Sequence, residues 1–472
     1  MNAPGPCLRR LVCLALAAGA AVVVFPTRAA AVPAFARKYQ TSCQTCHILF
    51  PKLNAFGEAF RLRGYRMPAE TEDMVRQKPV SLGAPAYKRL WPKAVWPGEL
   101  PGNVPLAVNL KFADVNTSAL NEDGTVASVR NDFQFPQEAN IFAAGTLGDH
   151  VSFFSEVTFG KEPDGSVSVE LEHARLAFDS PFGREDLFHF RIGKMAPNVA
   201  AGFQEMWIST DAAIDSLFSF NPIGVRGGTG LAGEGSPAPI SLPASVRGIE
   251  VYGIINHRVL WVGGVVNGIL PASNDAGRFD GNNAKDLYAR LDYKLGGMGL
   301  DGDMGGKEPP AENWRDNSLR VGALIYRGDG TSINFASTDL EGNPLNIQDL
   351  HFLRYGLYAS LFVQNLNVSG ALLHGTDQLR LFEPVSGGSL GIIQPDYRAW
   401  FVQADYVFYP WLQGTFRYET VKPFDPTVLS LRTGVWNVSA LVRANVKAMI
   451  EYQRDLREGR NHSLNGLVRF AF

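Results

Sequence analysis

The chain has 472 residues, and its 44 basic and 46 acidic side chains leave a formal net charge of −2. This balance argues against a nucleic-acid partner, which selects clustered positive charge. The length alone is compatible with two or three domains. Glycine and phenylalanine are abundant, at 48 and 30 residues. No long apolar run follows the N-terminal segment, so we expect no helical membrane span in the mature chain.

Residues 1–31 have the pattern of a secretory signal peptide. Two arginines precede an apolar run, residues 11–25, and three alanines end the segment at Ala31. A positive start, an apolar centre and an Ala-x-Ala site are typical of an export signal that is removed. The alternative is a membrane anchor, but the run is short for a spanning helix. We therefore expect export and cleavage, which removes Cys7 and Cys13.

The mature chain keeps two cysteines, in the sequence Cys43-Gln44-Thr45-Cys46-His47. This C-x-x-C-H spacing is the pattern for covalent attachment of c-type haem. The two thiols form thioethers with the haem vinyl groups, and the adjacent imidazole binds the iron. A zinc site would need four ligands, and no second thiol pair remains. A thioredoxin-type dithiol would need a preceding strand, and a disulfide would close only a tiny loop. The sequence predicts one haem c on Cys43 and Cys46, with His47 as a metal ligand.

Residues 32–68 are expected to form the small helical module that carries this haem, because their apolar residues recur at helical spacing. So short a segment has little core of its own, and a covalent haem would supply one. No histidine lies within residues 48–149. Met67 is therefore the candidate for the sixth iron ligand, and Met74 is a weaker candidate. His/Met ligation would raise the reduction potential. The alternative is that Met67 only fills the core.

Residues 69–103 are rich in proline and are typical of an extended linker. In residues 104–472 the apolar period becomes two. In the segment 400–409, for example, Gln403 and Asp405 occupy the face opposite most of the aromatic residues. About sixteen runs alternate in this way, each about ten residues long, the length that a tilted strand needs to cross a bilayer. They begin near residues 104, 137, 150, 167, 185, 246, 258, 284, 317, 350, 366, 397, 411, 434, 446 and 462.

The connections between these runs alternate between short and long. Residues 147–150 form a tight connection, whereas residues 196–245 form a long one. Short periplasmic turns and long external loops give this alternation in outer-membrane barrels. One connection breaks it, because residues 296–316 should be short and are not. A soluble β-sandwich also alternates apolar and polar residues, but it would not sort its loops by length. The predicted fold is mainly β: an antiparallel transmembrane barrel preceded by a small α-helical cytochrome domain.

Charged residues on the polar strand faces would line the interior of the barrel. The residues expected there are Asp286, Arg290, Arg417 and Glu419, together with His173 and Arg175.

Two other patterns carry no prediction of a site. Residues 228–233 match G-x-G-x-x-G, but they lie in a loop and not after a strand of a βαβ unit. Three histidines, His150, His257 and His351, lie near strand ends without the spacing of metal ligands.

The N-terminal module resembles that of the fused monohaem cytochrome c–porin family of bacterial outer-membrane proteins. The matching residues are Pro33, Phe35-Ala36-Arg37, the haem motif, Pro51, Phe56-Gly57, Phe60 and Gly64-Tyr65. The resemblance is specific over about thirty-five residues, and over the barrel it is architectural only. It implies one c-type haem domain ahead of a sixteen-stranded barrel, with Cys43, Cys46 and His47 in the family's roles. It does not secure Met67. The final Phe472 also resembles the assembly signal of outer-membrane proteins.

The resemblance implies an electron-transfer protein of the bacterial outer membrane that oxidises extracellular Fe(II), with a periplasmic cytochrome or another electron carrier as partner. No catalytic side chain is predicted. The haem module would lie on the periplasmic side or in the lumen of the barrel. Two alternatives stay open: a haem-plugged porin for solute transport, and outward electron transfer to an extracellular acceptor.

Overall fold

The computed structural model describes residues 34–67, 80–81, 87–93, 99–102, 104–120, 126–161, 167–183, 186–199, 208–218, 226–227, 242, 245–267, 284–329, 334–338, 344–382, 388–394, 396–422, 430–457 and 461–472. The expected signal peptide, Met74 and the glycine motif at 228–233 lie outside the described residues.

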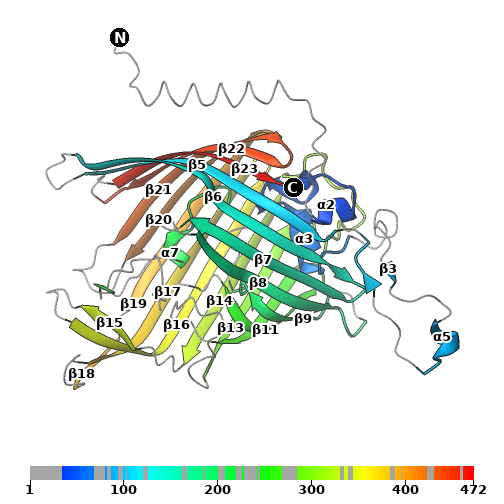
Figure 1. Cartoon of the computed structure of the whole chain (residues 1–472), viewed down its shortest axis with the longest axis horizontal. Helices are drawn as coiled ribbons and strands as arrows, with labels where there is room; N and C mark the ends of the chain where they lie inside the picture. Colours follow the sequence, from blue (N-terminus) through cyan, green and yellow to red (C-terminus); the bar gives the residue numbers. More distant parts are fainter. Residues whose placement is uncertain are drawn as a thin grey trace, which may run out of the picture.

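The described strands form a closed antiparallel barrel (Figure 1). The main sheet has 19 strands, of which three short ones lie beside the ring, and the other sixteen close it. Closure occurs where β23 pairs with β5 and where β9 pairs with β11. The ring consists of β5 (Leu106–Leu120), β6 (Val126–Leu147), β7 (Val151–Lys161), β8 (Val167–Asp179), β9 (His189–Met195), β11 (Val246–Ile255), β12 (Val259–Asn267), β13 (Lys285–Gly296), β14 (Ser318–Asp329), β16 (Pro344–Val363), β17 (Leu366–Phe382), β19 (Asp396–Tyr409), β20 (Leu412–Lys422), β21 (Leu431–Arg443), β22 (Val446–Asp455) and β23 (Asn461–Ala471). The short strands are β10 (Arg226–Gly227), β15 (Asn334–Thr338) and β18 (Ser389–Ile393).

The closed ring confirms the barrel predicted for residues 104–472. The predicted strand starts lie within four residues of the observed ones, except for β6 and β16. β6 begins earlier, at Val126, because its backbone stays paired with β5. β16 begins earlier, at Pro344, because its backbone is paired with β15. Backbone pairing, and not apolar alternation, therefore sets where these strands begin.

On β19 the outer face is apolar and exposed, and the inner face carries buried polar side chains. On β19 the side chains of Val402, Tyr406 and Phe408 on the outer face are 44%, 45% and 54% exposed. Gln403 and Asp405 on the inner face are 1% and 2% exposed. An apolar outer surface around a buried polar interior is the arrangement of a barrel that spans a membrane. A soluble sandwich would bury the opposite face.

Residues 34–67 form a small module that is less helical than the apolar spacing predicted. Its elements are α2 (Ala34–Lys38), the 3₁₀ turn η1 (Cys43–Thr45), β1 (His47–Leu49), β2 (Lys52–Leu53) and α3 (Ala55–Leu62). The hairpin of β1 and β2 interrupts the helical pattern at Pro51, which has no amide hydrogen to donate within a helix. Asn54 caps the N-terminus of α3, because its side chain accepts a hydrogen bond of 2.8 Å from the amide of Gly57.

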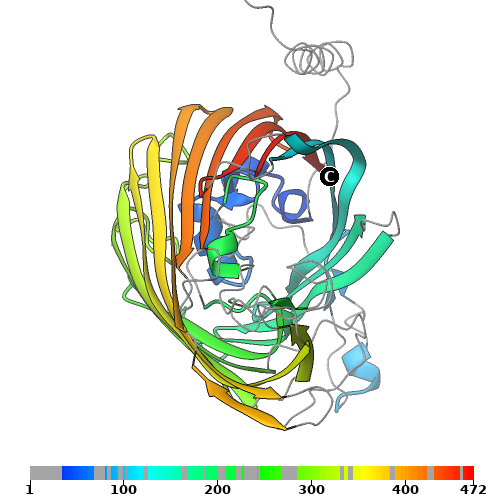
Figure 2. The same cartoon turned by 90° about the vertical axis from the view of Figure 1, so that its left-hand side faces the viewer.

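The module lies inside the barrel, at the end where the short turns are (Figure 2). The side chain of Gln44 donates a hydrogen bond of 3.2 Å to the carbonyl of Pro410, in the turn between β19 and β20. The hydroxyl of Tyr252 on β11 donates one of 3.0 Å to the carbonyl of Leu62. Ion pairs join the module to three other strands: Lys52–Asp405 at 2.5 Å, Glu58–Arg320 at 2.5 Å and Arg66–Asp179 at 2.8 Å.

The proline-rich stretch between the module and the barrel is not wholly extended. In its described part, β3 (Val80–Ser81) pairs with β4 (Glu99–Leu100), and α5 (Tyr87–Leu90) forms a single turn. None of the described helices is long and apolar enough to cross a bilayer.

Part of the predicted external loop 196–245 folds into the lumen instead. Residues 208–218, which end in α7 (Asp215–Phe218), lie within the barrel (Figure 2). The carboxylate of Glu419 accepts from the amide of Ser216 at 2.9 Å, and that of Glu451 accepts from the amide of Asp211 at 2.8 Å. Arg417 donates to two backbone carbonyls of the segment. Charged lumenal side chains thus satisfy backbone groups that an exposed loop would leave to water.

We predict that Leu291→Arg destabilises the barrel. Leu291 is 57% exposed on the outer face of β13, in the middle of the strand. A charged side chain at the bilayer midplane costs about 2–4 kcal/mol, whereas the cost near the interface falls to roughly 0–1 kcal/mol. The matched control is Leu295→Arg, near the end of the same strand. Urea-induced unfolding in lipid vesicles measures both variants, and equal stability of the two would contradict the membrane-spanning face.

Candidate functional site

The two cysteines lie on the turn that begins the haem-motif segment. Cys43 starts η1, and the amide of Cys46 donates a hydrogen bond of 3.2 Å to the carbonyl of Cys43. Both thiols are free. Burial raises the pKa of Cys43, and it raises the pKa of Cys46 to about 12. Both groups are therefore neutral thiols near pH 7, unlike the low-pKa thiolates of redox dithiols and zinc sites.

The imidazole of His47 has one nitrogen fixed and the other left for a ligand. Its Nδ1 lies 3.0 Å from the carbonyl oxygen of Pro51, so Nδ1 carries the proton and donates it. Burial lowers the pKa of His47 to about 4, which keeps the ring neutral. A neutral imidazole whose Nδ1–H is held by a carbonyl presents the lone pair of Nε2, the usual state of a metal-binding histidine.

Gly57 allows helix α3 to pack directly on the motif. A Cβ atom at Gly57 would lie 2.0 Å from the carbonyl oxygen of Cys46, which only glycine permits. The close contact joins the helix to the turn that carries the second thiol. The sequence pattern placed this glycine in the module but did not show its role.

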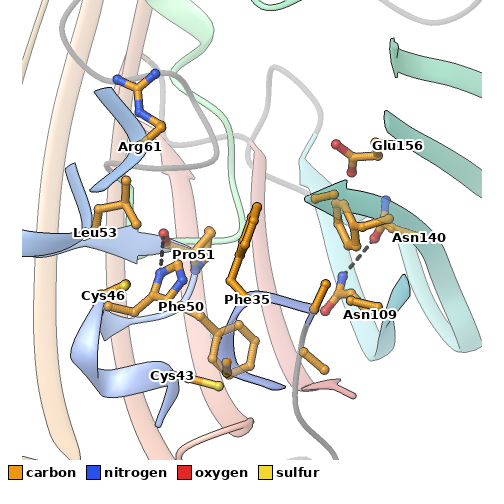
Figure 3. A pocket seen from close by; sticks show the side chains of 18 of the residues that line it. Phe35, Cys43, Cys46, Phe50, Pro51, Leu53, Arg61, Asn109, Asn140 and Glu156 are labelled. Atoms are coloured by element: carbon orange, nitrogen blue, oxygen red, sulfur yellow. Dashed lines mark hydrogen bonds between the residues drawn. The ribbon is translucent and has the colours of Figure 1, made fainter. Parts of the chain in front are cut away.

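All four predicted site residues line one cavity. Cys43, Cys46, His47 and Met67 contribute to its wall, and the cavity has a volume of about 490 Å³, within the usual range for small-molecule and cofactor sites. It lies between the module and the barrel wall formed by β5 to β8 and β23. Figure 3 shows Cys43 and Cys46 on the module side, with Asn109, Asn140 and Glu156 across the open space.

The module side of the cavity is aromatic. The rings of Phe35 and Tyr65 stack at 4.5 Å between centroids, and Phe60 meets both edge-on. Phe154 on β7 continues this cluster, stacked on Tyr65 at 6.2 Å. Met67, which is 8% exposed, packs into the same cluster. Sequence reasoning named Met67 as a candidate but did not name Phe154, because a single strand does not show which lumenal side chains meet the module.

The barrel side of the cavity is polar. A row of hydrogen bonds crosses four strands, from Asn109 to Asn140 at 2.8 Å, from Asn140 to Thr158 at 2.9 Å, and from Thr158 to Glu172 at 2.5 Å. Glu156 also lines the cavity and accepts a hydrogen bond from the ring of His173. The predicted lumenal position of His173 is correct, since it is buried on the inner face of β8. Arg175 also faces inward, where its guanidinium bonds the hydroxyl of Tyr65.

The remaining lumenal predictions also hold. The side chains of Asp286, Arg290, Arg417 and Glu419 are all buried on the inner face. Among the described residues, no group of three His, Cys, Asp or Glu side chains is arranged to hold a metal ion.

The connection predicted at residues 296–316, which had no short turn, spans residues 297–317 in the structure and holds the module in place. The side-chain amide of Asn313 donates to the carbonyl oxygens of Gln44 at 2.6 Å and of His47 at 3.0 Å. Trp314, 9% exposed, packs against Ile48 and Leu49. The sequence showed only that this connection is longer than expected, and it did not show what the connection contacts. Its contacts explain that length, since a two-residue turn would not reach the motif.

The donor set and the cavity fit a c-type haem. Two neutral thiols lie one turn apart, a neutral imidazole presents a free nitrogen beside them, and a thioether lines the same aromatic-walled space. The structure thus brings together the residues that the sequence had grouped.

Comparison with known proteins gives similarity to solved outer-membrane barrels. No family model matches the chain, and no curated protein matches it either. A loop-deletion variant of OmpT from Vibrio cholerae is 13% identical, with 78% of this chain and 99% of that chain covered and a TM-score of 0.44. OmpF of Salmonella typhi, in complex with daunomycin, is 9% identical, with 78% and 97% covered and a TM-score of 0.47. An anion-selective porin from Comamonas acidovorans is 8% identical, with 78% and 99% covered and a TM-score of 0.45. At these values the likeness carries no argument about function.

We predict that Asn313→Ala loosens the haem-motif segment while the barrel stays folded. The substitution removes two hydrogen bonds to partly buried carbonyls, a loss of about 1–3 kcal/mol. Hydrogen exchange followed by mass spectrometry should show faster exchange over residues 44–49. The control is Asn317→Ala, which removes a bond to the amide of Gln364 in a neighbouring turn instead. Equal exchange over 44–49 in the wild-type protein and Asn313→Ala would contradict the holding role of the 297–317 connection.

Proposed function

We propose that the chain is an outer-membrane electron-transfer protein in which one covalent c-type haem lies inside a sixteen-stranded barrel. The donor is extracellular Fe(II), and the acceptor is a periplasmic cytochrome or another electron carrier. One observation carries the proposal: Cys43, Cys46, His47 and Met67 line a single cavity enclosed by module and barrel. When bound, haem c supplies a one-electron redox couple, which none of these side chains provides.

The side chains have separate roles in this proposal. The thiols of Cys43 and Cys46 tether the group, and Nε2 of His47 binds the iron because Pro51 holds the Nδ1 proton. Met67 is the proposed sixth ligand, supplied by its thioether sulfur. The aromatic cluster around Tyr65 excludes water from one side of the site, and a dry site with a thioether ligand favours a high potential.

The orientation of the barrel in the membrane follows from its connections, which are short at one end and long at the other. If the short turns face the periplasm, as in outer-membrane barrels generally, the module lies at the periplasmic end of the lumen. A periplasmic carrier then approaches the haem from the short-turn end. The donor enters from the long-loop end, where residues 208–213 form part of the cavity wall.

A haem-plugged porin is the second candidate, and the porin-like barrel favours it. The way the module is fixed argues against free passage of solutes. Lys52 of the module and Asp405 of the barrel are 2% to 3% exposed and lie 2.5 Å apart. Residues 208–218 also occupy the lumen. Separating a buried ion pair is costly, about 3–5 kcal/mol when one partner is lost. Outward transfer to an extracellular acceptor uses the same residues and differs only in potential.

We predict that Met67→Ala lowers the midpoint potential of the haem, because loss of a thioether ligand removes its preference for ferrous iron. The absorption spectrum should also lose its low-spin His/Met character. Met195→Ala is the matched control, since Met195 is also buried, on β9, but does not line the cavity. An unchanged potential and spectrum in Met67→Ala would remove Met67 from the site.

We predict that the haem-loaded protein in liposomes is reduced by Fe(II) and is closed to neutral sugars. Reduction is followed in the visible spectrum, and sugar passage is followed by liposome swelling. A variant with Cys43→Ser and Cys46→Ser is the control for reduction through the haem. Rapid sugar passage without reduction by Fe(II) would favour the porin alternative. A clearly negative midpoint potential would favour outward transfer.

A further inference from the structure

Three basic residues form a row across neighbouring strands beside the cavity. Lys447 on β22 is in direct register with Arg469 on β23, and Arg469 is in register with Lys111 on β5. Lys111 and Arg469 line the cavity. The ammonium of Lys447 lies 5.6 Å from the ring centroid of Phe50, another lining residue. We call Lys111, Lys447 and Arg469 the cationic row.

Acidic side chains lie beside the cationic row, and several of their oxygens already have other partners. Asp211 lies 2.5 Å from Lys111 and 3.7 Å from Arg469. Glu451 is the other acidic group near Lys447. Its carboxylate oxygens accept hydrogen bonds from the amides of Asp211 and Ala212 and from the side chain of Asn437. Glu138, the register partner of Lys111 on β6, lines the cavity beside Glu156 and Glu172.

Two nitrogens of the row have no hydrogen-bond partner among the residues that the structure describes. They are Nζ of Lys447, on a side chain that is fully buried, and Nε of Arg469. An isolated buried ammonium is strongly unfavourable unless it is paired, and like charges side by side on neighbouring strands repel each other. An anion bound beside the row would supply acceptor oxygens to these two donors.

We propose that the cationic row binds the propionate carboxylates of the haem. The inference rests on the proposed function and names a part of the site that the haem motif does not contain. The cavity separates an aromatic side, suited to a macrocycle, from a wall with cations, suited to carboxylates. Arginine and lysine are the side chains that pair best with such groups. The barrel thereby contributes Lys111 and Arg469 to a cavity wall that also carries Arg61 of the module.

The row should raise the reduction potential. Reduction adds one negative charge to the haem, and nearby positive charges stabilise the reduced form more than the oxidised form. Removal of these charges should therefore lower the potential without changing the iron ligands.

The test uses the full-length haem-loaded protein with Lys447→Gln and Arg469→Gln combined. The expected result is a lower midpoint potential and shifted propionate bending bands in the resonance Raman spectrum, with His/Met absorption unchanged. Lys447→Arg should keep the wild-type bands. Lys294→Gln is the matched control, because Lys294 is a buried lumenal lysine paired with Asp316 at 2.8 Å and does not line the cavity.

Unchanged propionate bands and potential in the double variant would overturn the inference. If the double variant is not recovered in the membrane, Arg469→Gln alone gives the same readouts. Added inorganic phosphate tests whether the row binds a free anion instead of the propionates. A phosphate-dependent shift of the wild-type potential that Arg469→Gln abolishes would assign the row to a free anion. A wild-type protein without covalent haem would refute the proposed function itself. Unchanged bands in a haem-loaded double variant would refute only the role of the cationic row.

Discussion

The structure depends on a charged lumen that binds a polar plug. A membrane barrel turns its apolar side chains outward, so its interior must satisfy the charges that its alternating strands place there. In this chain the N-terminal module satisfies many of them. Glu58 pairs with Arg320, Lys52 with Asp405, and Arg66 with Asp179. These pairs are buried, so loss of either partner would leave an uncompensated charge, and the module is therefore part of the folded barrel.

This arrangement makes the candidate site a joint product of two segments far apart in sequence. The module brings two thiols, an imidazole and an aromatic cluster around Tyr65. The barrel brings Phe154, the row of hydrogen-bonded side chains that begins at Asn109, and the cationic row. A haem held there would have its iron ligands set by one segment and its electrostatic surroundings set by the other. The reduction potential would then depend on whether the module is correctly seated.

Much of the barrel and the core of the site could be predicted from the sequence. Alternation on segments such as 400–409 reports strand faces directly, and the haem motif is local, so neither needs tertiary information. The holding role of Asn313, the inward fold of residues 208–218 and the cationic row could not be predicted. Each depends on which lumenal side chains meet across the barrel, and that is fixed by strand register and closure. The helical prediction for the module failed between His47 and Leu53, where Pro51 and a short hairpin override the apolar spacing.

The central claim is that a haem is covalently attached within the lumen, and one measurement tests it most directly. The protein is produced in a host that matures c-type cytochromes and is purified from its outer membrane. Haem peroxidase staining after denaturing electrophoresis then reports covalent attachment. The account predicts a stained band at the mass of the barrel, which is lost when Cys43→Ser and Cys46→Ser are combined. It also predicts that His47→Ala keeps the stain but loses the low-spin spectrum. A folded barrel from this host without stain and without Soret absorbance would contradict the account.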